Sequence, residues 1–209
     1  FVISHASPIV AITGIPDEAY EGSAITLGSS VTDPDADDTF TYAWSVTKNG
    51  GAYDVGESIT TEATFTFTPD DDATYAVTLT VTDDDGQGTA SETIVVGNVA
   101  PTLAVSGDTS VDEGSVYTLN LSATDPGDDT ITQWVIDWGD GQVETVTGNP
   151  PSVQHTYADG PDVYAITATA TDEDGSYIAS AMAEAGDLDG VFNSIGWITA
   201  DPASVYDYG

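Results

Sequence analysis

The feature that most constrains the fold is a strand-like block followed by an acidic loop, which the chain carries twice. Residues 73–86 read ATYAVTLTVTDDDG, and residues 162–175 read DVYAITATATDEDG. In both blocks apolar residues alternate with residues that are mostly threonine, which is the period of a strand with one buried face. A glycine closes each loop, as a tight turn favours. The sequence therefore predicts two copies of one β-module.

Two further repeats fix the length of the module. The tripeptide TDP at 32–34 returns at 124–126, and the pair Glu-Gly at 21–22 returns at 113–114, each 92 residues later. A module of this size is long enough to enclose its own core. We therefore expect one domain over residues 1–97, a second over 98–186, and a tail over 187–209.

Short alternating segments separated by turn signals recur through both modules, and none has a helical period. The expected fold is all-β, with two tandem immunoglobulin-like β-sandwiches followed by the tail. The run Lys48-Asn49-Gly50-Gly51 is a strong hairpin signal. Three large aromatic residues are expected in the cores, namely Trp44, Trp134 and Trp138.

The charge balance restricts the partners of this chain. There are 36 acidic residues against one Lys or Arg, so nucleic acid and anionic membrane surfaces are disfavoured as partners and cations are favoured. No apolar run approaches the ~20 residues that span a bilayer. With no cysteine, disulfides and thiolate metal sites are excluded. The composition favours an extracellular location, and because the chain begins at Phe1 we expect a processed product or a part of a longer protein.

The acidic residues gather in loops beside glycine or proline, where they could ligate a metal ion. Calcium takes six to eight oxygen ligands, whereas magnesium prefers to keep its waters. With no Cys and two His, zinc and iron are disfavoured. We therefore expect Ca²⁺ as the cofactor. The candidate ligands are Glu21, Asp33, Asp35, Asp70, Asp72, Asp83, Asp85, Asn98, Asp125, Asp128, Asp172 and Asp174.

Two simpler interpretations of the acidic loops stay open. Asp-Gly and Asp-Pro are common turn formers, so the loops could be solvated turns. An acidic surface poor in lysine also suits a protein adapted to high salt. Catalysis is not expected, because the sequence has no nucleophile elbow and its paired carboxylates lie in glycine-closed loops with no evident cleft.

The second module resembles the PKD (polycystic kidney disease) repeat, an immunoglobulin-like sandwich. The matching residues are Trp134, the run Asp137-Trp138-Gly139-Asp140-Gly141, the run His155-Thr156-Tyr157, and 164–175. The first module matches at the Glu-Gly turn, the TDPD loop, Trp44 and 75–86, but it lacks the GDG run and is better described as PKD-type or cadherin-like. The resemblance implies binding and spacer modules of secreted and surface proteins, without catalysis.

The resemblance also implies where the acidic loops lie. In an immunoglobulin-like fold, the start of the chain and two of the loops gather at one end of the sandwich. The linker Asn98-Val99-Ala100-Pro101 is similar to cadherin linkers, which enclose calcium together with paired acidic loops. The resemblance therefore implies a calcium site formed by the linker and the loops around Asp125 and Asp172, opposite Glu21 and the turn 70–72.

The expected function is a non-catalytic, calcium-binding extracellular structural or adhesive segment, such as a repeat of a surface fibre with calcium-rigidified domain junctions. Its expected partners are calcium and copies of itself or other surface proteins, in a head-to-tail assembly. The alternative is an accessory polysaccharide- or protein-binding module of a secreted hydrolase. The tail 187–209 is either an intersubunit strand or the start of a third module.

Overall fold

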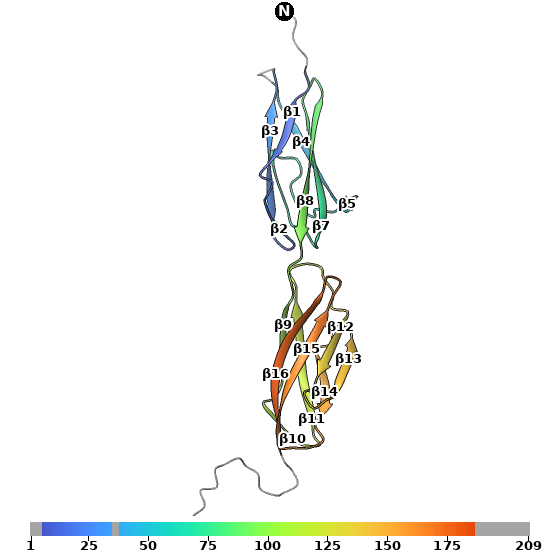
Figure 1. Cartoon of the computed structure of the whole chain (residues 1–209). Coiled ribbons are helices and arrows are strands. Elements are labelled where there is room, and N and C mark those ends of the chain that lie inside the picture. Colours follow the sequence, from blue (N-terminus) through green and yellow to red (C-terminus); the bar gives the residue numbers. More distant parts are fainter. Residues whose placement is uncertain (1–5, 35–37, 187–209) are drawn as a thin grey trace, which may run out of the picture. The chain divides into compact units, whose positions relative to one another are not determined.

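The computed structural model describes residues 6–34 and 38–186, and every regular element in these ranges is a β-strand (Figure 1). The candidate ligand Asp35 and the tail 187–209 lie outside the described residues. The strands are β1 (Ile9–Thr13), β2 (Ala19–Tyr20), β3 (Ile25–Thr32), β4 (Thr41–Lys48), β5 (Gly51–Tyr53), β6 (Thr64–Phe67), β7 (Ala73–Thr82), β8 (Gln87–Gly97), β9 (Thr102–Ser106), β10 (Ser110–Asp112), β11 (Val116–Thr124), β12 (Gln133–Asp137), β13 (Val143–Thr147), β14 (Ser152–Thr156), β15 (Asp162–Thr171) and β16 (Ser176–Gly186).

The chain divides into two compact units. Unit 1 comprises Phe1–Thr102 together with two acidic loops, Ala123–Thr130 and Asp172–Gly175. Unit 2 comprises the remaining described residues, which are Leu103–Ser122, Ile131–Thr171 and 176–186. Although the two loops come late in the sequence, their contacts therefore place them with unit 1.

Unit 1 contains two sheets. One has the strand order β1-β3-β6, and the other has the order β2-β8-β7-β4-β5. The pairs β1–β3, β3–β6, β4–β5, β4–β7 and β7–β8 are antiparallel, whereas the short strand β2 pairs with β8 in parallel. Side chains from the inner faces of both sheets form one core, as in a β-sandwich.

Unit 2 repeats the strand order of unit 1. Its sheets run β14-β11-β9 and β10-β16-β15-β12-β13, and β10 pairs with β16 in parallel as β2 pairs with β8. Each strand of unit 2 thus corresponds to the unit 1 strand whose number is lower by eight, so that β9 corresponds to β1 and β16 to β8. The structure confirms the all-β fold class with two tandem immunoglobulin-like sandwiches.

The expected hairpin is present between β4 and β5. Lys48 pairs with Gly51, and the two residues between them have positive φ, 49° at Asn49 and 83° at Gly50. Asparagine and glycine tolerate this region better than other residues, which is why Asn-Gly selects the two-residue turn. Because β4 also pairs with β7, the last residue of β4 lies opposite Tyr75, close in sequence to the acidic turn 70–72.

The three tryptophans are buried as predicted. Trp44 stacks on Phe65 in unit 1, with ring centroids 5.4 Å apart. In unit 2 the inner face of β15 carries small residues, Ala168 and Ala170, and the fully buried rings of Trp134 and Trp138 occupy this core. A core keeps its packing density only when small residues on one strand are matched by large ones elsewhere.

The sequence analysis missed β13 and the short strands β2 and β10. In β13 all residues except Val146 are exposed, so the segment has no buried face to produce an alternating pattern. Among the described strands it pairs with β12 alone, at the edge of its sheet. In the described part of the chain we find no helix with the length and apolar character that a membrane crossing requires.

Candidate metal centre

Glu21 is the most deeply buried acidic residue among the described residues of unit 1. It follows β2, and its own backbone N–H donates to the carbonyl of Gly97 at 3.2 Å. The side chain is 1% exposed, and its Oε1 accepts a hydrogen bond from the backbone N–H of Val99 at 2.6 Å. The other oxygen, Oε2, is buried and has no hydrogen-bond partner among the described residues. A buried carboxylate oxygen is costly unless a proton or a cation reaches it.

Asp125 and Asp172 show how the repeated loops orient their first aspartate. In each residue Oδ1 accepts backbone N–H groups of its own turn, from Gly127 at 2.7 Å and from Gly175 at 2.8 Å. In each residue Oδ2 is buried and without a partner in the described structure. The turn therefore fixes the carboxylate through one oxygen and leaves the other available to a ligand. Asp172 is 6% exposed as a whole.

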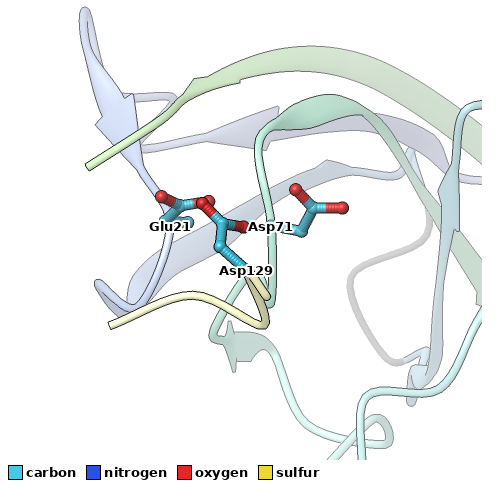
Figure 2. A group of neighbouring side chains, drawn as sticks. All are labelled: Glu21, Asp71 and Asp129. Atoms are coloured by element: carbon cyan, nitrogen blue, oxygen red, sulfur yellow. The ribbon is translucent and has the colours of Figure 1, made fainter. Parts of the chain in front are cut away.

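Asp71 and Asp129 complete the centre around Glu21 (Figure 2). One carboxylate oxygen from each of Glu21, Asp71 and Asp129 lies within 4.8 Å of the other two. Both oxygens of Asp129 are buried without a partner in the described part of the chain. The loop that carries Asp129 is held in place through its backbone, since the N–H of Asp128 donates to the carbonyl of Asp70 at 2.7 Å.

Two glycines permit this close approach of loops. A Cβ on Gly127 would lie 2.7 Å from Cδ of Glu21 and 3.2 Å from Oδ1 of Asp125. A Cβ on Gly22, whose φ is +67°, would lie 2.7 Å from the carbonyl oxygen of Pro126. A larger residue at Gly127 would displace the Glu21 carboxylate, and one at Gly22 would push the backbone of Pro126 away, because such distances are shorter than van der Waals contact.

In the metal-free centre, burial and mutual repulsion disfavour the ionisation of all the carboxylates at once. Burial raises the pKa of Glu21, and the charges of Asp125 and Asp71 raise it further, against the lowering effect of the backbone N–H groups of Val99 and Asp72. Burial also raises the pKa of Asp129 to about 7, with added repulsion from Glu21, Asp125 and Asp174. Near neutral pH the metal-free centre therefore carries a proton or bears a strong repulsion.

A second triplet adjoins the first and shares Asp71 with it. Ligand atoms of Asp71, Asp72 and Asp174 lie within 4.8 Å of one another. Burial raises the pKa of Asp72, and the neighbouring charges of Asp174 and Asp71 add to this effect. Asp174 lies in the same loop as the buried Asp172, so the loop 172–175 contributes to the same acidic region as Glu21 and Asp129.

Asp70 has a different role from the other acids of its turn. Its Oδ1 accepts hydrogen bonds from Nζ of Lys48 at 2.9 Å and from the hydroxyl of Tyr75 at 2.8 Å. Burial alone would raise the pKa of Asp70, but these two hydrogen bonds outweigh burial and lower it. Lys48 thus neutralises Asp70, which belongs to neither triplet. Asp71 binds Lys48 as well but belongs to both triplets.

A further acidic cluster of unit 1 involves the other TDxDG loop. Ligand atoms of Asp33, Asp38 and Asp83 lie within 4.8 Å of one another, and so do those of Asp38, Asp84 and Asp85. Asp83 repeats the local geometry of Asp172, since its Oδ1 accepts the N–H of Asp85 at 2.9 Å and of Gly86 at 2.7 Å. These side chains are half-buried or exposed, in contrast to Glu21 and Asp172.

The structure distributes the predicted ligands over several places; Asp70 pairs with Lys48, and Asp35 lies outside the described residues. Glu21, Asp72, Asp125 and Asp174 lie in the acidic region around Asp71, and Asp172 belongs to the same loop as Asp174. Asp33, Asp83 and Asp85 belong to the other cluster. Asp128 has an exposed side chain, and Asn98 immediately precedes the Val99 N–H that binds Glu21. Sequence reasoning missed two central residues, Asp71 and Asp129, although both belong to the acidic runs that it singled out.

Comparison with known proteins agrees with this fold. The two-sheet strand order defines the class, an immunoglobulin-like β-sandwich. Residues 98–185 match the family model described as PKD domain, and residues 18–96 match the one described as K319L-like, PKD domain. The chain therefore belongs to the PKD domain family and carries two such domains in tandem. PKD domains occur in extracellular proteins and are typically non-catalytic modules.

Individual relatives resemble only parts of this chain or its general fold. A stretch of 130 residues is 32% identical to chitinase A of Pseudoalteromonas piscicida, covering 59% of this chain but only 15% of the chitinase. The PKD domain of an M14-like peptidase from a Thermoplasmatales archaeon is 26% identical, with a TM-score of 0.37, and covers 43% of this chain and 98% of that domain. The amphioxus IgVJ-C2 molecule is 17% identical, with a TM-score of 0.41, over 79% of this chain and 98% of that molecule.

Proposed function

We propose that this chain is a non-catalytic, extracellular structural segment whose acidic centre in unit 1 binds calcium. The observation that carries the proposal is a set of five buried carboxylate oxygens without hydrogen-bond partners in the described structure. They are Oε2 of Glu21, Oδ2 of Asp125, Oδ1 and Oδ2 of Asp129, and Oδ2 of Asp172. Folded proteins rarely leave buried polar atoms unpaired, so such a set implies a ligand.

The chemistry of these oxygens favours calcium over other ligands. A single proton satisfies one oxygen of the set, whereas a calcium ion takes six to eight oxygens at about 2.3–2.6 Å and can draw the rest from carbonyls and water. Its double positive charge also offsets the repulsion that raises the pKa of Glu21 and Asp129. Magnesium fits less well, because it demands a near-ideal octahedron and gives up its water reluctantly.

The consequence of binding is mechanical. The cation would fasten the loops 123–130 and 172–175 to the turns that carry Glu21 and Asp71. Both loops are continuous in sequence with strands of unit 2, because they follow β11 and β15. Binding to the folded state alone would stabilise unit 1 and restrict the movement of the loops, which suits a stiff spacer.

Calorimetric titration of the metal-stripped protein tests the proposal. At pH 7.5 and 0.15 M KCl, we expect calcium to bind with measurable heat and to raise the unfolding temperature, while magnesium at the same concentration has a much smaller effect. The variant Asp129→Asn should lose most of this binding. Equal, weak effects of calcium and magnesium that persist in Asp129→Asn would show that the acids act only as a diffuse negative surface.

A second candidate function is a spacer or binding module of a secreted polysaccharide hydrolase. It rests on the 32% identity to part of a chitinase. Binding of sugars commonly relies on exposed aromatic faces, yet Tyr20 is the one large aromatic among the exposed hydrophobic residues in the described ranges, at 46%. We therefore favour the spacer role within this candidate. Retention of the purified chain on insoluble chitin would instead support a binding role.

A further inference from the structure

The chain contains a single Lys or Arg among its 209 residues, and that residue, Lys48, lies beside the acidic centre. Its Nζ is 2.9 Å from Oδ1 of Asp70 and 2.7 Å from Oδ2 of Asp71. The Lys48 side chain is 24% exposed, so these ion pairs are partly shielded from solvent. Although the chain has 36 acidic residues, its one lysine side chain lies against this turn.

Asp71 is the residue that connects Lys48 to the proposed calcium site. The carboxylate of Asp71 accepts the hydrogen bond from Lys48 and also contributes a ligand atom to both acidic triplets of the centre. Its side chain is 31% exposed, and no other described residue belongs to both triplets. A cation held by Glu21, Asp71 and Asp129 would therefore share a carboxylate with the ammonium group of Lys48.

The hydrogen bonds of Lys48 show that its charge is firmly held in the metal-free protein. Burial would lower the pKa of Lys48, but the hydrogen bonds to Asp71 and Asp70 outweigh burial and raise it well above its usual range. The groups that face Nζ are Asp70, Asp71 and the hydroxyl of Tyr75, which itself donates to Asp70 and to the carbonyl of Asp71. The ammonium group thus stays charged and close to Asp71.

We propose that Lys48 is an internal counter-cation of the acidic centre: it neutralises Asp71 in the metal-free protein and opposes the bound calcium, so that it sets the calcium affinity of the site. This inference rests on the proposed function, because it concerns the same site. Two positive ions that share one carboxylate repel each other. Lys48 therefore stabilises the metal-free state and weakens the metal-bound state.

The proposal differs from a purely structural role of Lys48 in the sign of one effect. If Lys48 only held the turn 70–72 in place, its removal would weaken calcium binding together with stability. If Lys48 opposes the metal, its removal weakens the metal-free protein but tightens calcium binding. The two quantities change in opposite directions only in the second case.

The test compares Lys48→Met, Lys48→Gln and Lys48→Arg with the wild type in calorimetric calcium titrations at 0.15 M KCl. We expect Lys48→Met to bind calcium roughly three- to tenfold more tightly, since a unit charge within several ångström of a divalent ion has an effect of this order even at the dielectric constant of water. Lys48→Arg keeps the charge and should bind as the wild type does. Lys48→Gln keeps an amide that can donate to Asp71, and serves if Lys48→Met does not fold.

Each outcome of this comparison decides between the alternatives. Unchanged or weaker calcium binding in the neutral variants overturns the role of Lys48 while leaving the calcium site intact. Absence of calcium binding in the wild type overturns both the proposed function and the inference. As a further check, the effect of Lys48→Met should be smaller in an Asp71→Asn background, because the ammonium group and the calcium ion then no longer share a carboxylate.

Discussion

The variant Glu21→Gln separates a calcium site from a set of solvated turns, because it should have opposite effects with and without metal. In the metal-free protein, the substitution removes one negative charge from a group whose ligand atoms lie within 4.8 Å of one another. At this separation and an effective dielectric constant of 20, each like-charge pair costs about 3.5 kcal/mol. Partial protonation of Asp129, whose pKa is about 7, and solvent screening reduce the net gain to about 1 kcal/mol at pH 8.

A gain of this size is large enough to measure. For a domain of about 100 residues, it raises the unfolding temperature by about 4–8 °C. In excess calcium the order reverses, because the wild type gains about 2.7 kcal/mol at a free calcium concentration 100 times its dissociation constant, while the variant has lost an anionic ligand. Differential scanning calorimetry should therefore show the higher unfolding temperature for Glu21→Gln in chelator and for the wild type in excess calcium.

Glu113→Gln is the matched control. Glu113 occupies the same Glu-Gly turn in unit 2, where its Oε2 accepts the N–H of Gly160 at 3.0 Å, much as Glu21 accepts the N–H of Val99. The amide oxygen introduced there can accept the same bond, so stability should change little and calcium binding should not change. Destabilisation of Glu21→Gln in chelator, or an equal response of both variants to calcium, would refute the reasoning.

Three further predictions concern pH, loop packing and unit 2. The pKa of Asp129 is raised to about 7 in the folded, metal-free protein. The stability that its bound proton contributes is therefore complete below pH 4 and is lost as the pH rises through 7. Denaturant titrations in chelator should show a loss of about 2 kcal/mol between pH 5 and 8, since screening reduces the upper bound of about 4. Gly127→Ala, whose Cβ meets Glu21, should weaken calcium binding about tenfold in calorimetry. Asp140→Asn loses the charged acceptor of His155 at 2.8 Å, and should cost about 1–2 kcal/mol in urea unfolding without affecting calcium binding.

Much of the fold follows from the sequence because burial and turn chemistry act locally. Alternation in 73–82 and 162–171 predicts β7 and β15, since each strand buries one face. Asn49-Gly50 predicts the β4–β5 hairpin, since few other pairs adopt its positive φ angles. The repeated TDxDG motif predicts a turn, because an aspartate side chain readily accepts the backbone N–H two residues further on.

The composition of the acidic centre could not be predicted in the same way. In the run Asp70-Asp71-Asp72, Asp70 and Asp71 bind Lys48, whereas Asp71 and Asp72 lie close to Asp174, and the sequence does not reveal this division. The register between β4 and β7 decides this, by placing Lys48 opposite Tyr75. In the pair Asp128-Asp129, the hydrogen bond from the Asp128 N–H to Asp70 fixes the loop and leaves the Asp128 side chain exposed. These are contacts between distant segments, and no local pattern encodes them.

The most direct test of the central claim is anomalous diffraction from crystals of the chain grown with calcium. We expect an anomalous peak within about 2.3–2.6 Å of carboxylate oxygens of Glu21 and Asp129, with further oxygen ligands from the neighbouring acidic loops. Crystals of the same form grown with chelator in place of calcium should lack the peak. A calcium-grown crystal that shows ordered Glu21 and Asp129 carboxylates but no ion between them would contradict the account.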